Sequence, residues 1–247
     1  MFKDIEYFIK NKILTEKYLL KKRLKRSILN NYELELNFLE QFKDKNKDAI
    51  DIGVYRGVYS YKLSKLFNHI YAYEPNPLIY PYLKKNLTQI ISNITLSNYA
   101  LSNNDGDAML RIPNRTKSLF KNNIEELYKL GCATIHKQNN FDNYKAFSVK
   151  KKKLDEMIFK KKIGFIKIDV EGHENEVIQG AEKLLKNNKP VLLVEIEERH
   201  SKKKIIYTIK YIKSLGYECF FVKNSVLTMI DNLTQQDKNN NFYFLPK

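Results

Sequence analysis

Short apolar runs alternate with stretches of helical periodicity from residue 49 onward. The segments "AIDIG", "HIYAYE", "NITLSNYALS", "IGFIKIDV" and "PVLLVEIE" predict strands, and helices are expected at residues 57–68, 77–88, 174–187 and 203–214. "YECFFV" and "NFYFLP" predict two more strands near the end of the sequence. Such alternation is typical of an α/β fold with a mostly parallel sheet and helices on both faces.

The first 45 residues show no strand pattern and are predicted to be helical. "ELELNFLEQF" places Leu36, Leu39 and Phe42 on one helical face. We therefore expect two parts, an N-terminal basic helical arm at residues 1–45 and an α/β domain at residues 46–247. Residues 111–147 are rich in Asn and Lys and are expected to form an insertion over the site.

Ligands of open parallel sheets bind beyond the carboxyl ends of the strands. Functional residues are therefore expected directly after each strand. After the first strand, "DIGVYRG" offers Gly53 and Gly57 for a tight strand-to-helix turn. Glu74 follows the next strand, 23 residues after Asp51, where an acid can accept hydrogen bonds from a ribose diol. The turn lacks the third glycine of a pyrophosphate loop, which favours a compact nucleoside such as S-adenosylmethionine over a dinucleotide.

"IKIDVEGHE", residues 166–174, concentrates acids and a histidine behind a buried strand. Three interpretations stay open here. His173 could act as a general base, or Asp169 could be the base or, with Glu195 at the next strand end, a ligand of a divalent cation such as Mg²⁺. In the third, Glu171 and its neighbours only shape the turn and cap the following helix.

Two further histidines are weaker candidates. His136 could contact a substrate, although a surface position is the favoured interpretation, and His200 could border the acceptor pocket.

Several segments, taken in order, resemble the FkbM family of S-adenosylmethionine-dependent methyltransferases over roughly residues 32–247. They are "AIDIGVYRGVYS", "YAYEPNPLIYPYLKKNL", "NYALSNNDGDAMLRI", "KKLDEM", "IKIDVEGHENEVIQGAEKLL", "PVLLVEIE" and "NFYFLP". The resemblance implies the Rossmann-like class I methyltransferase fold, with a seven-stranded sheet that has one antiparallel strand. It also implies an enzyme that methylates hydroxyl groups, mostly of sugars or polyketide-like products.

The resemblance also implies a role for individual residues. The cofactor site is expected to comprise Asp51, Gly53, Tyr55, Gly57, Glu74, Asn76, Tyr99, Ala100 and Asp169. Asp169, Glu171 and His173 are the expected catalytic residues, with Glu174 a further candidate on the methyl-transfer side. The family often has "GAN" in the turn where this chain has "GVY", so Tyr55 replaces a small amide beside the methionine moiety.

Composition points to the partners. The formal net charge of +16 implies an anionic partner, and "KYLLKKRLKR" at residues 17–26 predicts a basic amphipathic helix suited to a membrane surface or a docking partner. With two cysteines, no signal peptide pattern and no long apolar stretch, we expect a cytoplasmic protein, peripheral at the inner membrane face through residues 17–26.

The leading hypothesis is O-methylation of a carbohydrate or glycan precursor in surface-polysaccharide biosynthesis, with an anionic acceptor. The alternative is a basic nucleic-acid-binding or non-catalytic protein on a methyltransferase fold. Nucleic acid is the weaker candidate, because the lysines are not interleaved with aromatic residues and no recognisable binding module is present.

Overall fold

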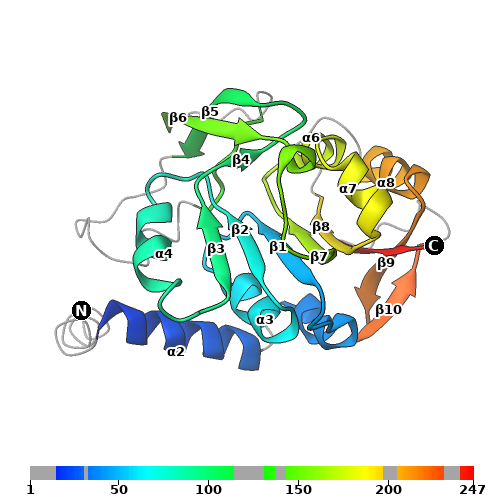
Figure 1. Ribbon diagram of the computed structural model, residues 1–247, viewed down its shortest axis with the longest axis horizontal. Helices are drawn as coiled ribbons and strands as arrows, with labels where there is room; N and C mark the ends of the chain where they lie inside the picture. Colours follow the sequence, from blue (N-terminus) through cyan, green and yellow to red (C-terminus); the bar gives the residue numbers. More distant parts are fainter. Residues whose placement is uncertain (1–14, 31–32, 114–130, 137–142, 197–204, 231–239) are drawn as a thin grey trace.

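A computed structural model describes residues 15–30, 33–113, 131–136, 143–196, 205–230 and 240–247. Its main sheet has eight strands in the order β10-β9-β11-β8-β7-β1-β2-β3 (Figure 1). Their bounds are β1 Asp48–Ile52, β2 Ile70–Tyr73, β3 Ile94–Ser97, β7 Ile163–Ile168, β8 Val191–Glu195, β9 Tyr217–Lys223, β10 Val226–Met229 and β11 Asn241–Pro246.

The pairing confirms the class I methyltransferase-like architecture. Strands β3, β2, β1, β7 and β8 run parallel, and β11 lies antiparallel between β8 and β9. The eighth strand, β10, pairs with β9 at the edge of the sheet. Asn224 and Ser225 turn the chain between them with positive φ angles of 49° and 59°, as a tight hairpin requires. The expected seven-stranded sheet is thus extended by one hairpin strand.

Helices cover both faces of the sheet (Figure 1). They are α3 Val58–Leu66, α4 Tyr80–Asn86, α6 Glu174–Gln179, α7 Glu182–Asn188 and α8 Ile205–Ser214. The prediction of a single helix at residues 174–187 was wrong, because the helix is interrupted at Gly180 and forms two helices, α6 and α7. A Cβ at Gly180 would lie 2.0 Å from the carbonyl oxygen of Ser102, so the break follows a close approach of two chain segments.

The N-terminal region packs on the domain. Helix α2, Glu16–Leu29, buries Leu20 and Leu24 and contacts α3 and α4, while most of its basic side chains are exposed. The expected helix at "ELELNFLEQF" is replaced by two 3-10 helices, η1 Leu34–Asn37 and η2 Leu39–Phe42. The domain boundary at residue 45 stays a prediction.

A second sheet of three strands, in the order β4-β6-β5, follows β3 in the chain and lies at the top of Figure 1. Its strands are β4 Ala100–Leu101, β5 Gly106–Pro113 and β6 Tyr144–Lys152. The ends of the expected insertion at residues 111–147 thus belong to this sheet, while residues 114–130 and 137–142 lie outside the described part. Among the described helices, none is long and apolar enough to cross a membrane.

Candidate functional site

A cavity of about 720 Å³ opens at the carboxyl ends of β1, β2, β7 and β8. This is the edge where a doubly wound sheet binds its ligands. Of the residues predicted from the sequence, the cavity is lined by Gly53, Tyr55, Glu74, Asn76, Tyr99, Ala100, Asp169, Glu171, His173 and Glu195. The structure therefore brings the predicted cofactor residues and the predicted catalytic residues into one space.

The glycine turn is fixed by the neighbouring strand end. Gly53 has a φ of 81°, and a Cβ there would lie 1.8 Å from the carbonyl oxygen of Asp169. Gly57 has a φ of 79°, and its Cβ would meet only the flexible end of the Leu87 side chain, at 2.8 Å. The turn that faces the cavity thus has no room for a side chain at Gly53.

Asp51 and Gly57, both predicted cofactor residues, are not among the residues that line the cavity. The fully buried Asp51 carboxylate accepts a hydrogen bond from the Ser60 hydroxyl at 2.5 Å. Burial raises the pKa of Asp51, opposed by the positive charge of Lys167. The structure therefore places Asp51 behind the turn, where it ties β1 to α3.

Glu74 is buried at the end of β2 and organises the turn. Its carboxylate accepts hydrogen bonds from the backbone N–H of Tyr55 at 2.8 Å and from that of Asn76 at 3.0 Å. A carboxylate has about four lone-pair sites, so two remain for a ligand in the cavity. Burial raises the pKa of Glu74 to about 7.

Tyr55 closes one side of the cavity. Its φ of 48° is left-handed, a conformation that persists in a non-glycine residue when its surroundings fix it. The phenol ring lies so close to Gly131 that a Cβ there would be 2.5 Å from it, and the Arg56 guanidinium lies 4.9 Å from the ring centroid. The ring that replaces the family's small amide thus forms a wall against residues 131–136.

Lys167, the residue before the last of strand β7, is a site residue that sequence reasoning missed. Its buried ammonium donates to the Asp169 carboxylate at 2.8 Å and to the Gly53 carbonyl at 3.1 Å. Burial alone would lower the pKa of Lys167, but the negative charges of Asp169 and Asp51 outweigh that effect and raise it. A lysine inside an apolar strand was the sequence signal that could have revealed it.

Glu195 at the end of β8 forms a carboxyl pair with Asp169. Burial, followed by the negative charge of Asp169, raises the pKa of Glu195 to about 8. Glu195 is therefore mostly protonated at neutral pH and donates a hydrogen bond to Asp169. The carboxyl group of Glu195 thus lies beside Asp169 and the ammonium of Lys167, where it can take up or release a proton near neutrality.

The turn after β7 is strained and held from two sides. Glu171 has a φ of 54°, and its carbonyl oxygen accepts a hydrogen bond from the Thr134 hydroxyl at 2.8 Å. Glu174 accepts from the backbone N–H of Gly172 at 2.8 Å and is not among the cavity-lining residues. Glu174 thus shapes the turn, whereas Glu171 and His173 border the cavity.

His173 lies between this turn and β4. One ring nitrogen, Nε2, is 2.9 Å from the Ser102 hydroxyl, and the other, Nδ1, is 3.6 Å from the Glu176 carboxylate. Burial lowers the pKa of His173 to about 4, so the ring is neutral at physiological pH. The predicted His200 falls outside the described residues.

Other parts of the wall come from the insertion expected at residues 111–147 and from the N-terminal region. Residues 131–133 and 135 cover the cavity beside Tyr55, and the N-terminal region contributes Ser27, Glu33 and Leu36. None of these segments follows a strand of the main sheet, so the strand-end rule could not find them.

Comparison with known proteins identifies the domain. The family model of the methyltransferase FkbM domain matches residues 51–219, while no curated protein sequence matches. A solved FkbM methyltransferase from Methylobacillus flagellatus aligns with a TM-score of 0.52 at 16% identity, over 81% of this chain and 44% of that one. This chain thus spans less than half the length of that relative.

A protein from Streptococcus mutans, described as a methyltransferase in complex with SAH, aligns with a TM-score of 0.48 at 12% identity. The alignment covers 87% of this chain and 96% of that one. An rRNA methylase from Streptococcus thermophilus has a TM-score of 0.44 at 12% identity, over 87% and 94% of the two chains.

Proposed function

Since this chain belongs to the FkbM methyltransferase family and is therefore an S-adenosylmethionine-dependent methyltransferase, we propose that it methylates a hydroxyl group of a carbohydrate or glycan precursor. The observation that supports this proposal is the single cavity shared by the Gly53 turn, Glu74 and the acidic strand ends. The family resemblance implies hydroxyl acceptors, and carboxyl groups in a cavity wall are suited to binding sugar hydroxyls.

The residues present fit the cofactor. S-adenosylmethionine, when bound, supplies an electrophilic methyl group on a sulfonium. The two free lone-pair sites of Glu74 suit a ribose diol, and Tyr99 with Ala100 borders the space beside it for the adenine. The methionine moiety is assigned to the Gly53 turn and Tyr55.

The acceptor hydroxyl needs a group that takes its proton. We assign this role to the Asp169–Glu195 pair, because burial raises the pKa of Glu195 to about 8 and so brings its proton exchange near neutral pH. His173 is a weaker base, since burial lowers its pKa to about 4. Glu171 is assigned to positioning the acceptor beside the pair.

Mg²⁺ was expected at Asp169 and Glu195, but the ammonium of Lys167 already occupies a position beside these acids. The Lys167 ammonium lies 2.8 Å from the Asp169 carboxylate. A fixed positive charge here already offsets the carboxylates, and a dication beside it would meet electrostatic repulsion. Our proposal therefore gives these acids a proton-transfer role.

The basic surface of helix α2 supports a proposal about the charge of the acceptor and the location of the protein. Helix α2 presents exposed Lys17, Lys21, Lys22, Lys25 and Arg26 while Leu20 and Leu24 are buried in the protein. Because its apolar face is occupied, we propose that residues 17–26 contact an anionic membrane face or acidic acceptor through charge alone. Such contact predicts binding that weakens as salt concentration rises.

Calorimetric titration with S-adenosylmethionine tests the cofactor assignment. Glu74→Ala should remove most of the binding shown by the wild type, whereas Glu218→Ala, a matched change on β9 outside the cavity, should leave it unchanged. No binding by the folded wild-type protein would contradict the assignment.

Transfer of a radiolabelled methyl group to nucleotide sugars and acidic glycans tests the acceptor class. Asp169→Asn should keep cofactor affinity within about a factor of ten but lower the transfer rate by at least about 100-fold, the contribution typical of a general base. Methylation of RNA and of no glycan would instead favour the nucleic-acid alternative, and cofactor binding without transfer to either would favour a non-catalytic protein.

A further inference from the structure

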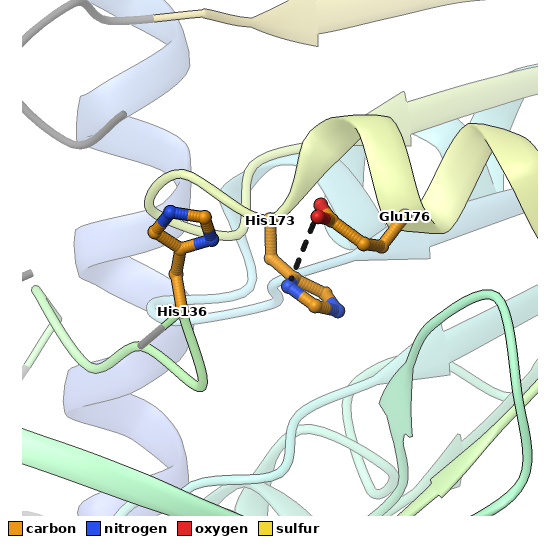
Figure 2. Close-up of side chains that lie close together, drawn as sticks. All are labelled: His136, His173 and Glu176. Carbon is orange, nitrogen blue, oxygen red and sulfur yellow. Dashed lines mark ion pairs between the residues drawn. The ribbon is translucent and has the colours of Figure 1, made fainter. Parts of the chain in front are cut away.

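We propose that His136, His173 and Glu176 bind a divalent transition-metal ion, with Zn²⁺ as the best match. One ligand atom from each residue lies within 4.8 Å of the other two. Figure 2 shows the three side chains gathered from two segments, with His136 on the loop of residues 131–136 and the other two at the start of α6. Two imidazoles and a carboxylate are a common zinc ligand set.

The hydrogen bonds around His173 leave the correct nitrogen available. The Ser102 hydroxyl lies 2.9 Å from Nε2 of His173. Because this hydroxyl can donate to the Asn103 side-chain oxygen at 3.4 Å, it is able to accept a hydrogen bond from Nε2–H of His173, and the proposal assigns this tautomer. The tautomer with its proton on Nε2 carries a lone pair on Nδ1, the atom that faces Glu176. Orientation of a ligand histidine by a hydrogen bond from its other ring nitrogen is typical of metal sites.

Two ring nitrogens at this position lack a hydrogen-bond partner. Within the described part of the chain, His136 Nε2 and His173 Nδ1 are both buried and accept or donate no hydrogen bond. Buried polar atoms without partners are rare and costly in proteins, and an ion that binds both would satisfy them. The two rings are 6.3 Å apart and inclined by 60°, so they do not stack.

The three ligand atoms must move closer together to bind a tetrahedral ion. Tetrahedral Zn²⁺, with bonds of about 2.0–2.1 Å, places its ligand atoms about 3.3–3.5 Å apart. The His173 Nδ1 to Glu176 Oε2 distance of 3.6 Å is close to this range. The remaining separations are at most 4.8 Å, so binding requires the His136 ring to move toward the other two ligands.

The site has a consequence for the cavity. Residues 131–133 and 135 line it, and Thr134 ties their loop to Glu171 through one hydrogen bond. A metal at His136 would add a second connection between the same loop and the turn after β7. The inference goes beyond the proposed methyl transfer, in which no step needs this ion.

The test uses the untagged full-length chain after chelator treatment, with Zn²⁺ added and followed by calorimetry. We expect one equivalent to bind the wild type, with affinity lowered at least tenfold in His136→Ala and in Glu176→Gln. His69→Ala is the matched control, because His69 contacts Thr95 away from the cluster. Its affinity should equal that of the wild type.

Substitution with Co²⁺ gives a second readout, because a tetrahedral nitrogen and oxygen site produces visible absorption bands that His136→Ala should abolish. Circular dichroism confirms that each variant is folded. Absence of Zn²⁺ binding by the wild type, or binding insensitive to all of these changes, would overturn the proposal. Neither measurement uses S-adenosylmethionine, so failure of the metal site and failure of methyl transfer are separate results.

Discussion

Replacement of Lys167 by methionine tests whether the buried ammonium holds the site together. Methionine preserves most of the side-chain volume and removes the charge. Lys167 is 7% exposed and its partner Asp169 is 26% exposed. The change leaves the Asp169 carboxylate without its counter-charge and the Gly53 carbonyl without its 3.1 Å donor.

The magnitude follows from burial. Loss of one partner of a buried ion pair costs about 3–5 kcal/mol of unfolding free energy. Because Asp169 retains some contact with water, we expect a loss of about 3 kcal/mol, at the low end of that range. Lys85→Met is the matched control, since Lys85 pairs with Glu16 at 3.0 Å but the two are 69% and 57% exposed. An exposed pair contributes about 0–1 kcal/mol.

Urea unfolding monitored by circular dichroism measures both variants. The midpoint should fall strongly for Lys167→Met and hardly for Lys85→Met, with the slope of the transition unchanged in both. In Lys167→Met combined with Asp169→Asn, part of the loss should be recovered, because the unpaired charge is then gone. Equal losses in the two single variants would refute the reasoning from burial.

Two further changes probe the same strand ends. Gly53→Ala should lower the unfolding free energy by at least about 2 kcal/mol in urea titrations, because a left-handed alanine costs about 1–2 kcal/mol and its Cβ would also overlap the Asp169 carbonyl. Gly57→Ala, whose Cβ meets only the Leu87 side chain, should cost less, and the reverse order would contradict the assigned turn. The pKa of Glu195 is raised from 4.5 to about 8, so the folded protein binds more protons than the unfolded chain between these values and wild-type stability should fall as pH rises through this window. Glu195→Gln should show a smaller fall in thermal midpoint from pH 5 to pH 8, and an identical profile would contradict the shift.

The sheet and half of the site could be predicted because they depend on local patterns. Strands β1, β7 and β8 are short apolar runs, and parallel strands place their carboxyl ends at one edge. Glu74 and Asp169 are therefore found together from their position after a strand alone. The family segments added the antiparallel strand of the sheet and the expected class of acceptor.

The rest depends on contacts between distant segments. The break at Gly180 exists because the Ser102 carbonyl approaches it, and no periodicity in residues 174–187 signals that approach. The contact of Tyr55 with Gly131 joins positions far apart in the chain. Residues 131–136 follow no strand of the main sheet, and the sequence predicted only that the insertion at residues 111–147 lies over the site. The individual wall residues and the grouping of His136 with His173 could not be derived from it.

The acids of "IKIDVEGHE" serve different roles once their neighbours are known. Glu174 holds the turn through Gly172, whereas Asp169 is bound to Lys167 and hydrogen-bonded to Glu195. Lys167 also donates to the Gly53 carbonyl on the cofactor turn. A single buried ammonium therefore contacts both the turn assigned to the methyl donor and the carboxyl pair assigned to the acceptor. Loss of that ammonium should weaken cofactor binding and proton transfer together. Loss of Glu74 should affect mainly cofactor binding, and loss of Glu195 should affect mainly proton transfer.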